Sequence, residues 1–229
     1  MNRAIIDYYD RLAASYDRDR FGSSYGTFID ARERRILRRW LSVDHSRVLE
    51  IACGTGRLSD SAHIGCDASQ ESLKIAKDRR PSTCFVAADA ARLPFKPESI
   101  DAVFAFHLFM HLDRGEIRSI LAEAARVLRD GGLFIADVVS ATRRSAGDRS
   151  NDGGVPWHGS TALSQAEFKM LCREFGLRPV RMSGLLFVPI HRVPNRLRPL
   201  LSGVDRWLCD RWPSLSSYLV GCFIKDASR

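Results

Sequence analysis

Three carboxylates stand at or near the ends of three successive short apolar stretches in the first half of the chain. Glu50 lies in Val-Leu-Glu-Ile-Ala-Cys-Gly-Thr-Gly (48–56), Asp67 ends His-Ile-Gly-Cys-Asp (63–67), and Asp89 ends Phe-Val-Ala-Ala-Asp (85–89). Short apolar runs rich in β-branched residues are typical of buried strands. Doubly wound α/β sheets bind ligands in the crevice outside the carboxyl ends of their strands. The three acids therefore predict a ligand site at one edge of such a sheet.

The turn after Glu50 is built from small residues. Ala52, Gly54 and Gly56 have little or no Cβ to obstruct a ligand, and glycine supplies the positive φ that such a turn usually needs. A tight turn without a ligand would have the same composition. In dinucleotide folds this turn carries a pyrophosphate, which a neighbouring glutamate would repel. Glu50 instead suits a ligand with an ammonium or sulfonium group.

The second and third acids have separate roles in the prediction. An acid at the end of the second strand accepts hydrogen bonds from ribose hydroxyls in nucleotide-binding α/β folds, and Asp67 holds that position. Ser69 follows as a cap for the next helix. Either Asp67 or Asp89 alone fits an ordinary turn or helix-entry aspartate. Three acids on successive strands favour one binding site.

The stretch after the third acid continues the alternation of strands and helices. Residues 100–106 read as a strand, and 113–129 as a helix with an apolar stripe and an Asp113–Glu116 capping box. Gly131 is expected to end that helix, and 133–139 is a near-continuous apolar strand, as expected when both sheet faces are covered.

These motifs resemble those of the class I S-adenosylmethionine-dependent methyltransferases, in particular a small-molecule subgroup like that of quinone biosynthesis. The resemblance rests on the turn 52–56, on Leu-Pro-Phe (93–95) and on Arg-Val-Leu-Arg-Asp-Gly-Gly (126–132), and covers about residues 5–139 well. It implies an α/β fold with a doubly wound, Rossmann-like, seven-stranded, mostly parallel sheet and one antiparallel strand near the C-terminus. The implied cofactor is S-adenosyl-L-methionine, with S-adenosyl-L-homocysteine as the product.

The resemblance also implies the cofactor contacts. Asp89 and the amide of Ala90 would meet the adenine, and Tyr16, in an amphipathic helix that closes over the cofactor, would touch its methionine end; plain core packing is the alternative for Tyr16. Two departures stand out: Ala52 replaces the family's first glycine, and the helix 57–62 has room for little more than one turn. The full set of expected cofactor residues is Tyr16, Glu50, Ala52, Gly54, Gly56, Asp67, Ala68, Asp89, Ala90 and Phe106.

Two histidines just past the fourth strand are the candidates for catalysis. His111 and His107 are each expected as a proton acceptor, which is needed only if the acceptor atom loses a proton. A structural role is the alternative for both. Their spacing of four would suit two metal ligands on a helix, but no third ligand is evident, so no metal site is expected. Trp157 and His158 are expected to line the acceptor pocket.

The remaining segments complete a single expected domain, 1–229. Residues 1–42 form a helical lid, 43–140 the cofactor-binding core, and 141–229 the substrate side with the last strands. Within the last part, a helix begins after Ser164 and ends at Gly176, strands cover 177–182 and 218–224, and apolar residues from Leu197 to Leu208 indicate an amphipathic helix. Acceptor specificity is expected in 184–215.

Bulk properties fit a globular enzyme. The 229 residues carry a net charge of +8, with 45% apolar and 27% charged residues. No signal-like or transmembrane run is visible, and the six scattered cysteines are interpreted as small buried residues, so a reducing cytoplasm is expected. The positive charge fits an acidic substrate, a nucleic acid or an anionic membrane surface, or simply a solvated helix face around 32–39. A monomer or homodimer without stable membrane insertion is expected.

The expected function is methyl transfer to a small, hydrophobic or aromatic acceptor, and three other functions are the alternatives. A nicotinamide dehydrogenase is disfavoured because Ser59 stands where the third fingerprint glycine belongs. A nucleic-acid methyltransferase is disfavoured because Phe-Ala-Phe-His (104–107) replaces the Asn/Asp-Pro-Pro-aromatic motif, and no nucleic-acid partner is expected. A non-catalytic protein that retains the fold stays open. Whether oxygen, nitrogen or carbon accepts the methyl group also stays open.

Overall fold

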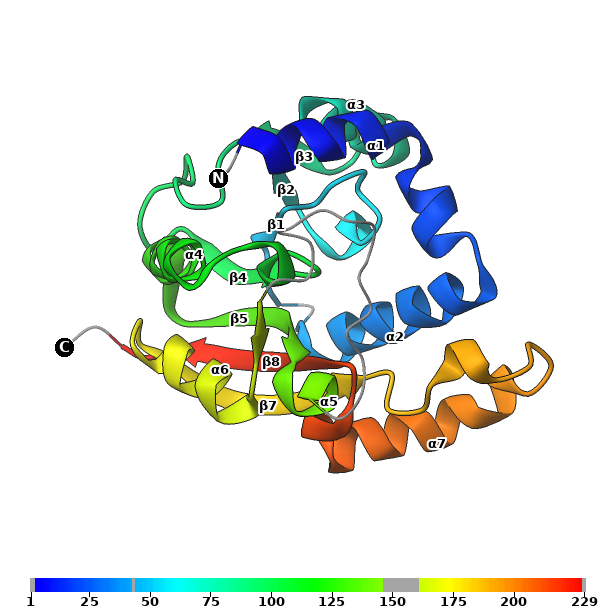
Figure 1. Ribbon diagram of the computed structural model, residues 1–229. Coiled ribbons are helices and arrows are strands. Elements are labelled where there is room, and N and C mark those ends of the chain that lie inside the picture. The colour runs from blue at the N-terminus through cyan, green and yellow to red at the C-terminus, as the bar shows by residue number, and fades with distance from the viewer. Residues whose placement is uncertain (1–2, 43, 146–160, 228–229) are drawn as a thin grey trace.

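A mixed β-sheet with helices on both faces organises the computed structural model, which describes residues 3–42, 44–145 and 161–227 (Figure 1). The strand order is β3-β2-β1-β4-β5-β8-β7, and the short β6 pairs with β5 beside this path. Only β8 runs antiparallel to its neighbours β5 and β7. This is the expected Rossmann-like sheet with one antiparallel strand, and β6 is an eighth strand that the sequence did not indicate. The strands are β1 (Val48–Ile51), β2 (Ile64–Asp67), β3 (Cys84–Ala87), β4 (Ile100–Ala105), β5 (Leu128–Ser140), β6 (Ala162–Leu163), β7 (Leu177–Leu185) and β8 (Tyr218–Lys225).

The helices cover the sheet in two layers because successive strand residues face opposite sides. Val103 of β4 packs in the cluster that contains α4 and α6, whereas Phe104 packs in the cluster that contains α2. Helices α1 and α3 contact each other beside the β3 end of the sheet (Figure 1). The helices are α1 (Arg3–Phe21), α2 (Ser24–Trp40), α3 (Gln70–Arg79), α4 (Arg114–Val127), α5 (Ala141–Ser145), α6 (Gln165–Arg173) and α7 (Arg198–Arg211), with single 3-10 turns η1 (Ser59–Ser61), η2 (Phe109–His111), η3 (Ile190–Arg192) and η4 (Pro213–Leu215).

Side-chain caps fix the starts of three helices where the sequence predicted them. Ser69 caps α3 by accepting from the Ser72 N–H. Asp113 opens α4 and Ser164 opens α6, each with a complete capping box. A side-chain oxygen in this position satisfies a backbone donor that has no partner within the helix.

The expected end of α4 at Gly131 is wrong. The helix ends at Val127, and Leu128 already has extended dihedral angles and pairs with Ile100 of β4. Gly131 has φ +73° inside β5, which therefore begins five residues before the expected 133. Pairing with β4 overrides the helical pattern of 128–129.

Two expectations about exposure are also corrected. Cys84 is exposed because β3 is the edge strand, while the other five cysteines are buried and all six are unpaired thiols. On α7, Leu201 and Leu208 face the protein more than Leu200 and Val204, which are 75% and 50% exposed. The predicted apolar stripe of α7 is thus divided between two faces.

Candidate active site

One cavity lies at the carboxyl ends of β1, β2 and β4, beneath α1. Its empty volume is about 880 Å³, counting its open mouth. Six of the expected cofactor residues and both expected catalytic histidines line it: Tyr16, Glu50, Ala52, Gly54, Asp67, Phe106, His107 and His111. The structure therefore brings together residues that stand up to 95 positions apart, from Tyr16 to His111.

The turn after β1 is held in left-handed conformations. Ala52, Gly54 and Gly56 have φ of 55°, 53° and 72°. A Cβ on Gly56 would lie only 3.1 Å from the Cβ of Ala76, so this glycine is required by packing as well as by φ. Ala52 has the strained φ with a Cβ present, which costs about 1 kcal/mol relative to glycine. The sequence thus predicted the turn but not the strained backbone at Ala52.

Glu50 is a buried carboxylate that faces the cavity. It is 4% exposed, and the Ser59 hydroxyl donates to its Oε2 at 2.5 Å. It forms no ion pair with any residue in the described parts of the chain. Burial raises the pKa of Glu50 to about 8, against the weaker lowering effects of Ser59 and Arg57. A cationic ligand in the cavity would supply the charge partner that this carboxylate lacks.

Asp67 is fixed by the backbone around it. The Gly54 N–H donates to its Oδ2 at 2.7 Å, and the Ser69 N–H donates to its Oδ1 at 2.8 Å. Burial nevertheless raises the pKa of Asp67 above its usual value. These bonds link the turn after β1 to the start of α3 and leave the carboxylate at the cavity wall.

Four expected cofactor residues do not line the cavity. Gly56 and Ala68 are absent from the cavity lining, and Ala90 is buried in the core with 2% exposure. Asp89 follows β3, the edge strand, where its Oδ1 accepts from the Ala91 N–H at 2.9 Å. Trp157 and His158 lie outside the described residues.

Polar contacts join α1 to the rim of the cavity. Ser69 Oγ donates to Asp10 Oδ1 at 2.6 Å, and Thr55 Oγ1 donates to Asp17 Oδ2 at 2.7 Å. Asp17 also pairs with Arg79 at 2.5 Å. Tyr16 lies on the buried side of the helix and packs edge-on against Tyr9. Helix α1 therefore forms the roof of the site.

His107 lies between two buried carboxylates. Its ring Nε2 is 2.6 Å from Glu33 Oε1, and its ring Nδ1 is 3.6 Å from Asp137 Oδ2. The backbone N–H of His107 donates to Asp137 Oδ1 at 2.7 Å. Burial lowers the pKa of His107, but Glu33 and Asp137 more than offset this, so its pKa is raised. Its φ is +58°, which places backbone strain at the cavity wall.

His111 has a different environment. Its Nε2 is 2.8 Å from the hydroxyl of Tyr9, and both side chains line the cavity. Burial raises the pKa of Tyr9, so this phenol stays protonated at neutral pH. The Tyr9 hydroxyl therefore keeps a proton to share in its hydrogen bond with His111.

The central part of the chain is similar to a known protein family. A family model described as a methyltransferase domain matches residues 49–136, which contain Glu50, Asp67, Asp89, His107 and His111. This match confirms the expected resemblance to the S-adenosylmethionine-dependent methyltransferases, with S-adenosyl-L-methionine as the expected cofactor.

Individual relatives match part of the chain. It is 32% identical over 60% of its length to the methyltransferase GfsG of Streptomyces halstedii, and 30% identical over 62% to the ubiquinone/menaquinone biosynthesis C-methyltransferase UbiE of Campylobacter jejuni. It spans 59% and 66% of those two proteins. A crystal structure of a possible histamine N-methyltransferase from Thermotoga maritima has the same fold, with a TM-score of 0.72, 20% identity, and coverage of 95% of this chain and 98% of that one.

Sequence reasoning missed several charged residues in and beside the cavity. Arg57 pairs with Glu33 and Asp30, each at 2.7 Å, and its guanidinium lies 3.8 Å from the centre of the Phe21 ring. Glu33 is fully buried, although it stands in an arginine-rich stretch that read as a solvated face. Asp137, 2% exposed in the apolar run of β5, carried the clearest signal, because an acid there needs a partner.

Proposed function

We propose that this protein moves a methyl group from S-adenosyl-L-methionine to a small hydrophobic or aromatic molecule. The observation that carries the proposal is Glu50, a buried carboxylate on the cavity wall without a cationic partner in the described residues. The amino acid end of the cofactor carries an ammonium group that fits this position. The bound cofactor supplies the activated methyl group, and the protein supplies its position and surroundings.

The proposed cofactor contacts follow the sheet. Glu50 and the turn at Gly54 receive the methionine end, and Asp67 receives the ribose hydroxyls. Asp89 and the Ala90 N–H receive the adenine, which is supported by their place after β3, the strand beside β2. The roof residue Tyr16 lies on the remaining side of the methionine end.

The proposed acceptor binds against the apolar part of the cavity. Aromatic and aliphatic side chains form this part, and the name of the C. jejuni relative, a ubiquinone/menaquinone biosynthesis C-methyltransferase, favours a similar aromatic acceptor. The wall residues are Tyr9, Phe21, Phe106, Leu108 and Leu112. An acceptor bound against this wall would displace water from the cavity, which helps the loss of sulfonium charge during transfer.

We assign different roles to the two histidines. His107 acts as a positioning residue, and its two carboxylate neighbours favour the protonated form by raising its pKa. His111, paired with Tyr9, is the proposed proton acceptor when the acceptor atom carries a proton. For a carbon or amine acceptor that needs no base, His111 has no part in the chemical step.

Calorimetry with the purified chain tests the cofactor. S-adenosylmethionine and S-adenosylhomocysteine are expected to bind in the micromolar range, and NAD is expected not to bind. NAD binding without either sulfur compound would refute the proposal. Incubation of the chain with methyl-labelled cofactor and a metabolite extract then tests transfer: a labelled small apolar product is expected, whereas cofactor binding without any labelled product would favour a non-catalytic binding protein.

A further inference from the structure

Exposed apolar side chains gather on residues 197–215. Among the described residues, eight large apolar side chains are at least 42% exposed, and six of these lie in this segment. They are Leu197, Leu200, Val204, Trp207, Trp212 and Leu215. Single exposed apolar residues are normal on a protein surface, but a contiguous group indicates an interaction site.

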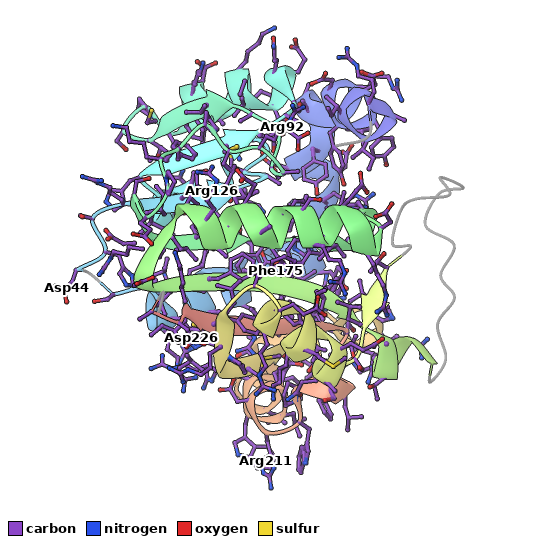
Figure 2. The ribbon with its side chains drawn as sticks, turned by 90° about the vertical axis from the view of Figure 1, so that its left-hand side faces the viewer. Asp44, Arg92, Arg126, Phe175, Arg211 and Asp226 are labelled. Atoms are coloured by element: carbon purple, nitrogen blue, oxygen red, sulfur yellow. The ribbon has the colours of Figure 1, made fainter. Side chains whose placement is uncertain are left out.

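Helix α7 presents three of these side chains in one outward row. Leu200, Val204 and Trp207 are spaced by four and three residues, so they lie on the same face. The opposite face is fixed to the body, where Asp205 and Cys209 are fully buried. Helix α7 runs along the outer edge of the molecule, and Figure 2 shows Arg211 at its end pointing away from the body. The outward row is therefore not needed to hold α7 in place.

The described charged side chains around this row that lack a charge partner are all positive. Four arginines on and before α7 form no ion pair with a described residue: Arg192, Arg196, Arg206 and Arg211. The two acids of α7 are already engaged. Asp205 accepts from the Val188 N–H at 2.8 Å, and Asp210 accepts from the Ser183 hydroxyl at 2.6 Å and from Arg39 at 3.1 Å. The surface thus combines an apolar row with unneutralised positive charge.

We propose that this face of α7 docks on the surface of an anionic lipid bilayer, with the helix axis in the membrane plane. Leucine, valine and tryptophan on one face with arginines beside them is the pattern of helices that lie in the interface between headgroups and acyl chains. The two tryptophans, whose rings are 5.5 Å apart, have the amphipathic character that this interface favours. The 14 residues of α7 are too few to cross a bilayer, and no described helix is long and apolar enough to do so, so the contact is peripheral.

A second copy of the chain fits this face less well. In a twofold dimer the same patch meets itself, so the unpaired arginines of both copies would face one another. An anionic partner removes that repulsion. Lipid headgroups supply negative charge along the whole length of the helix, together with an apolar layer for the leucine and tryptophan side chains.

Sedimentation with lipid vesicles tests the proposal. Wild-type chain is expected to bind vesicles of phosphatidylglycerol and phosphatidylcholine, to bind phosphatidylcholine alone much more weakly, and to be released by salt. The variant R196Q/R211Q is expected to bind the anionic vesicles about 25-fold more weakly, since each arginine near such a surface contributes about fivefold. L200S/W207S is expected to lose at least about tenfold.

Matched controls use exposed residues elsewhere. M170S and R173Q on α6 change the same kinds of exposed side chain and are expected to bind as wild type does. Thermal denaturation checks that every variant is folded. Equal binding to anionic and neutral vesicles, no binding to either, or equal effects of the α6 and α7 variants would overturn the proposal. So would a dimer that L200S/W207S dissociates without any vesicle binding by the wild type.

Discussion

Glu33 Oε1 lies 2.6 Å from Nε2 of His107, although the two residues are 74 positions apart and belong to α2 and to the loop after β4. The carboxylate is fully buried, and Arg57 holds its other oxygen at 2.7 Å. A carboxylate from α2 therefore contacts a histidine in the cavity wall and favours its protonated form. The consequence is an ion pair that contributes to folding and to the site at once.

Replacement of Glu33 by Gln is expected to destabilise the protein by about 3–5 kcal/mol, because it leaves His107 and Arg57 buried with one carboxylate fewer. Glu33 has a lowered pKa, as His107 and Arg57 outweigh the opposing effect of burial, and His107 has a raised pKa. The contribution of His107 is full below its unfolded value of about 6.5 and is lost as the pH rises through its raised folded pKa. The contribution of Glu33 to stability is present above about pH 4.5, its unfolded pKa, and is lost as the pH falls through its lowered folded pKa.

Urea denaturation of both proteins between pH 5 and pH 9 measures this effect. The wild type is expected to lose stability as the pH rises above 6.5, and E33Q is expected to lose less over the same range. Glu174→Gln, which changes an exposed acid paired with Arg118, is the control and should follow the wild-type profile. A parallel profile for E33Q would show that Glu33 does not set the protonation of His107.

Replacement of Glu50 by Gln is expected to have opposite effects on folding and on binding. The raised pKa of Glu50, about 8, means that its ionisation opposes folding increasingly as the pH rises from about 4.5 to 8. Without ligand, E50Q is therefore expected to be more stable than the wild type by about 4 kcal/mol at pH 8 and equally stable at pH 4. Its affinity for S-adenosylhomocysteine should fall about ten- to hundredfold because a charge-assisted contact is lost.

Thermal denaturation without ligand and calorimetry with S-adenosylhomocysteine give the two readouts for E50Q. Glu71→Gln, an exposed acid on α3 paired with Lys74, serves as the control and should change neither. If E50Q lowers the stability of the ligand-free protein or binds the ligand at full strength, Glu50 is a structural residue.

Replacement of Ala52 by Gly is expected to leave the stability unchanged or to raise it by up to about 1 kcal/mol, because the φ of +55° is strained for alanine. The same change at Ala122, an exposed position within α4, should cost about 0.5–1 kcal/mol. Chemical denaturation measures the change in the free energy of unfolding for each variant relative to the wild type. A loss of stability at position 52 as large as that at 122 would mean that the methyl group of Ala52 contributes packing that outweighs the strain.

The double variant D10N/D17N is expected to loosen the roof formed by α1. Both acids accept hydroxyl hydrogen bonds from the rim of the site, and the loss of about 1 kcal/mol for each pair should raise the rate of tryptic cleavage within α1 roughly thirtyfold. Bound S-adenosylhomocysteine is expected to slow cleavage of the wild type. Asp7→Asn, whose partner Arg3 lies on the same helix, should be cut at the wild-type rate. Equal cleavage of all three proteins would show that these contacts do not hold α1.

The sequence predicted what depends on neighbours along the chain. The end of β2 at Asp67 and the helix caps at Ser69 and Ser164 follow from local pattern and are found in the structure, whereas β1 ends one residue after Glu50. Gly131 failed as a helix end because strand pairing of Leu128 decided the boundary. The environment of His107 depends on a carboxylate from α2 and on a left-handed backbone, neither of which leaves a periodic signal. Periodicity likewise indicated an amphipathic α7 without showing which apolar residues face outward.

The order of strands has a consequence for how the chain is made. β7 contacts the sheet only through β8, which lies between it and β5 and comes later in the sequence. While the chain leaves the ribosome from its N-terminus, β1 to β5 can pair in turn, but residues 177–185 have no neighbour to pair with until 218–225 emerge. The nascent protein therefore carries an unpaired strand and the helix α7 that follows it until β8 emerges, and during that interval both are open to aggregation or to capture by a chaperone.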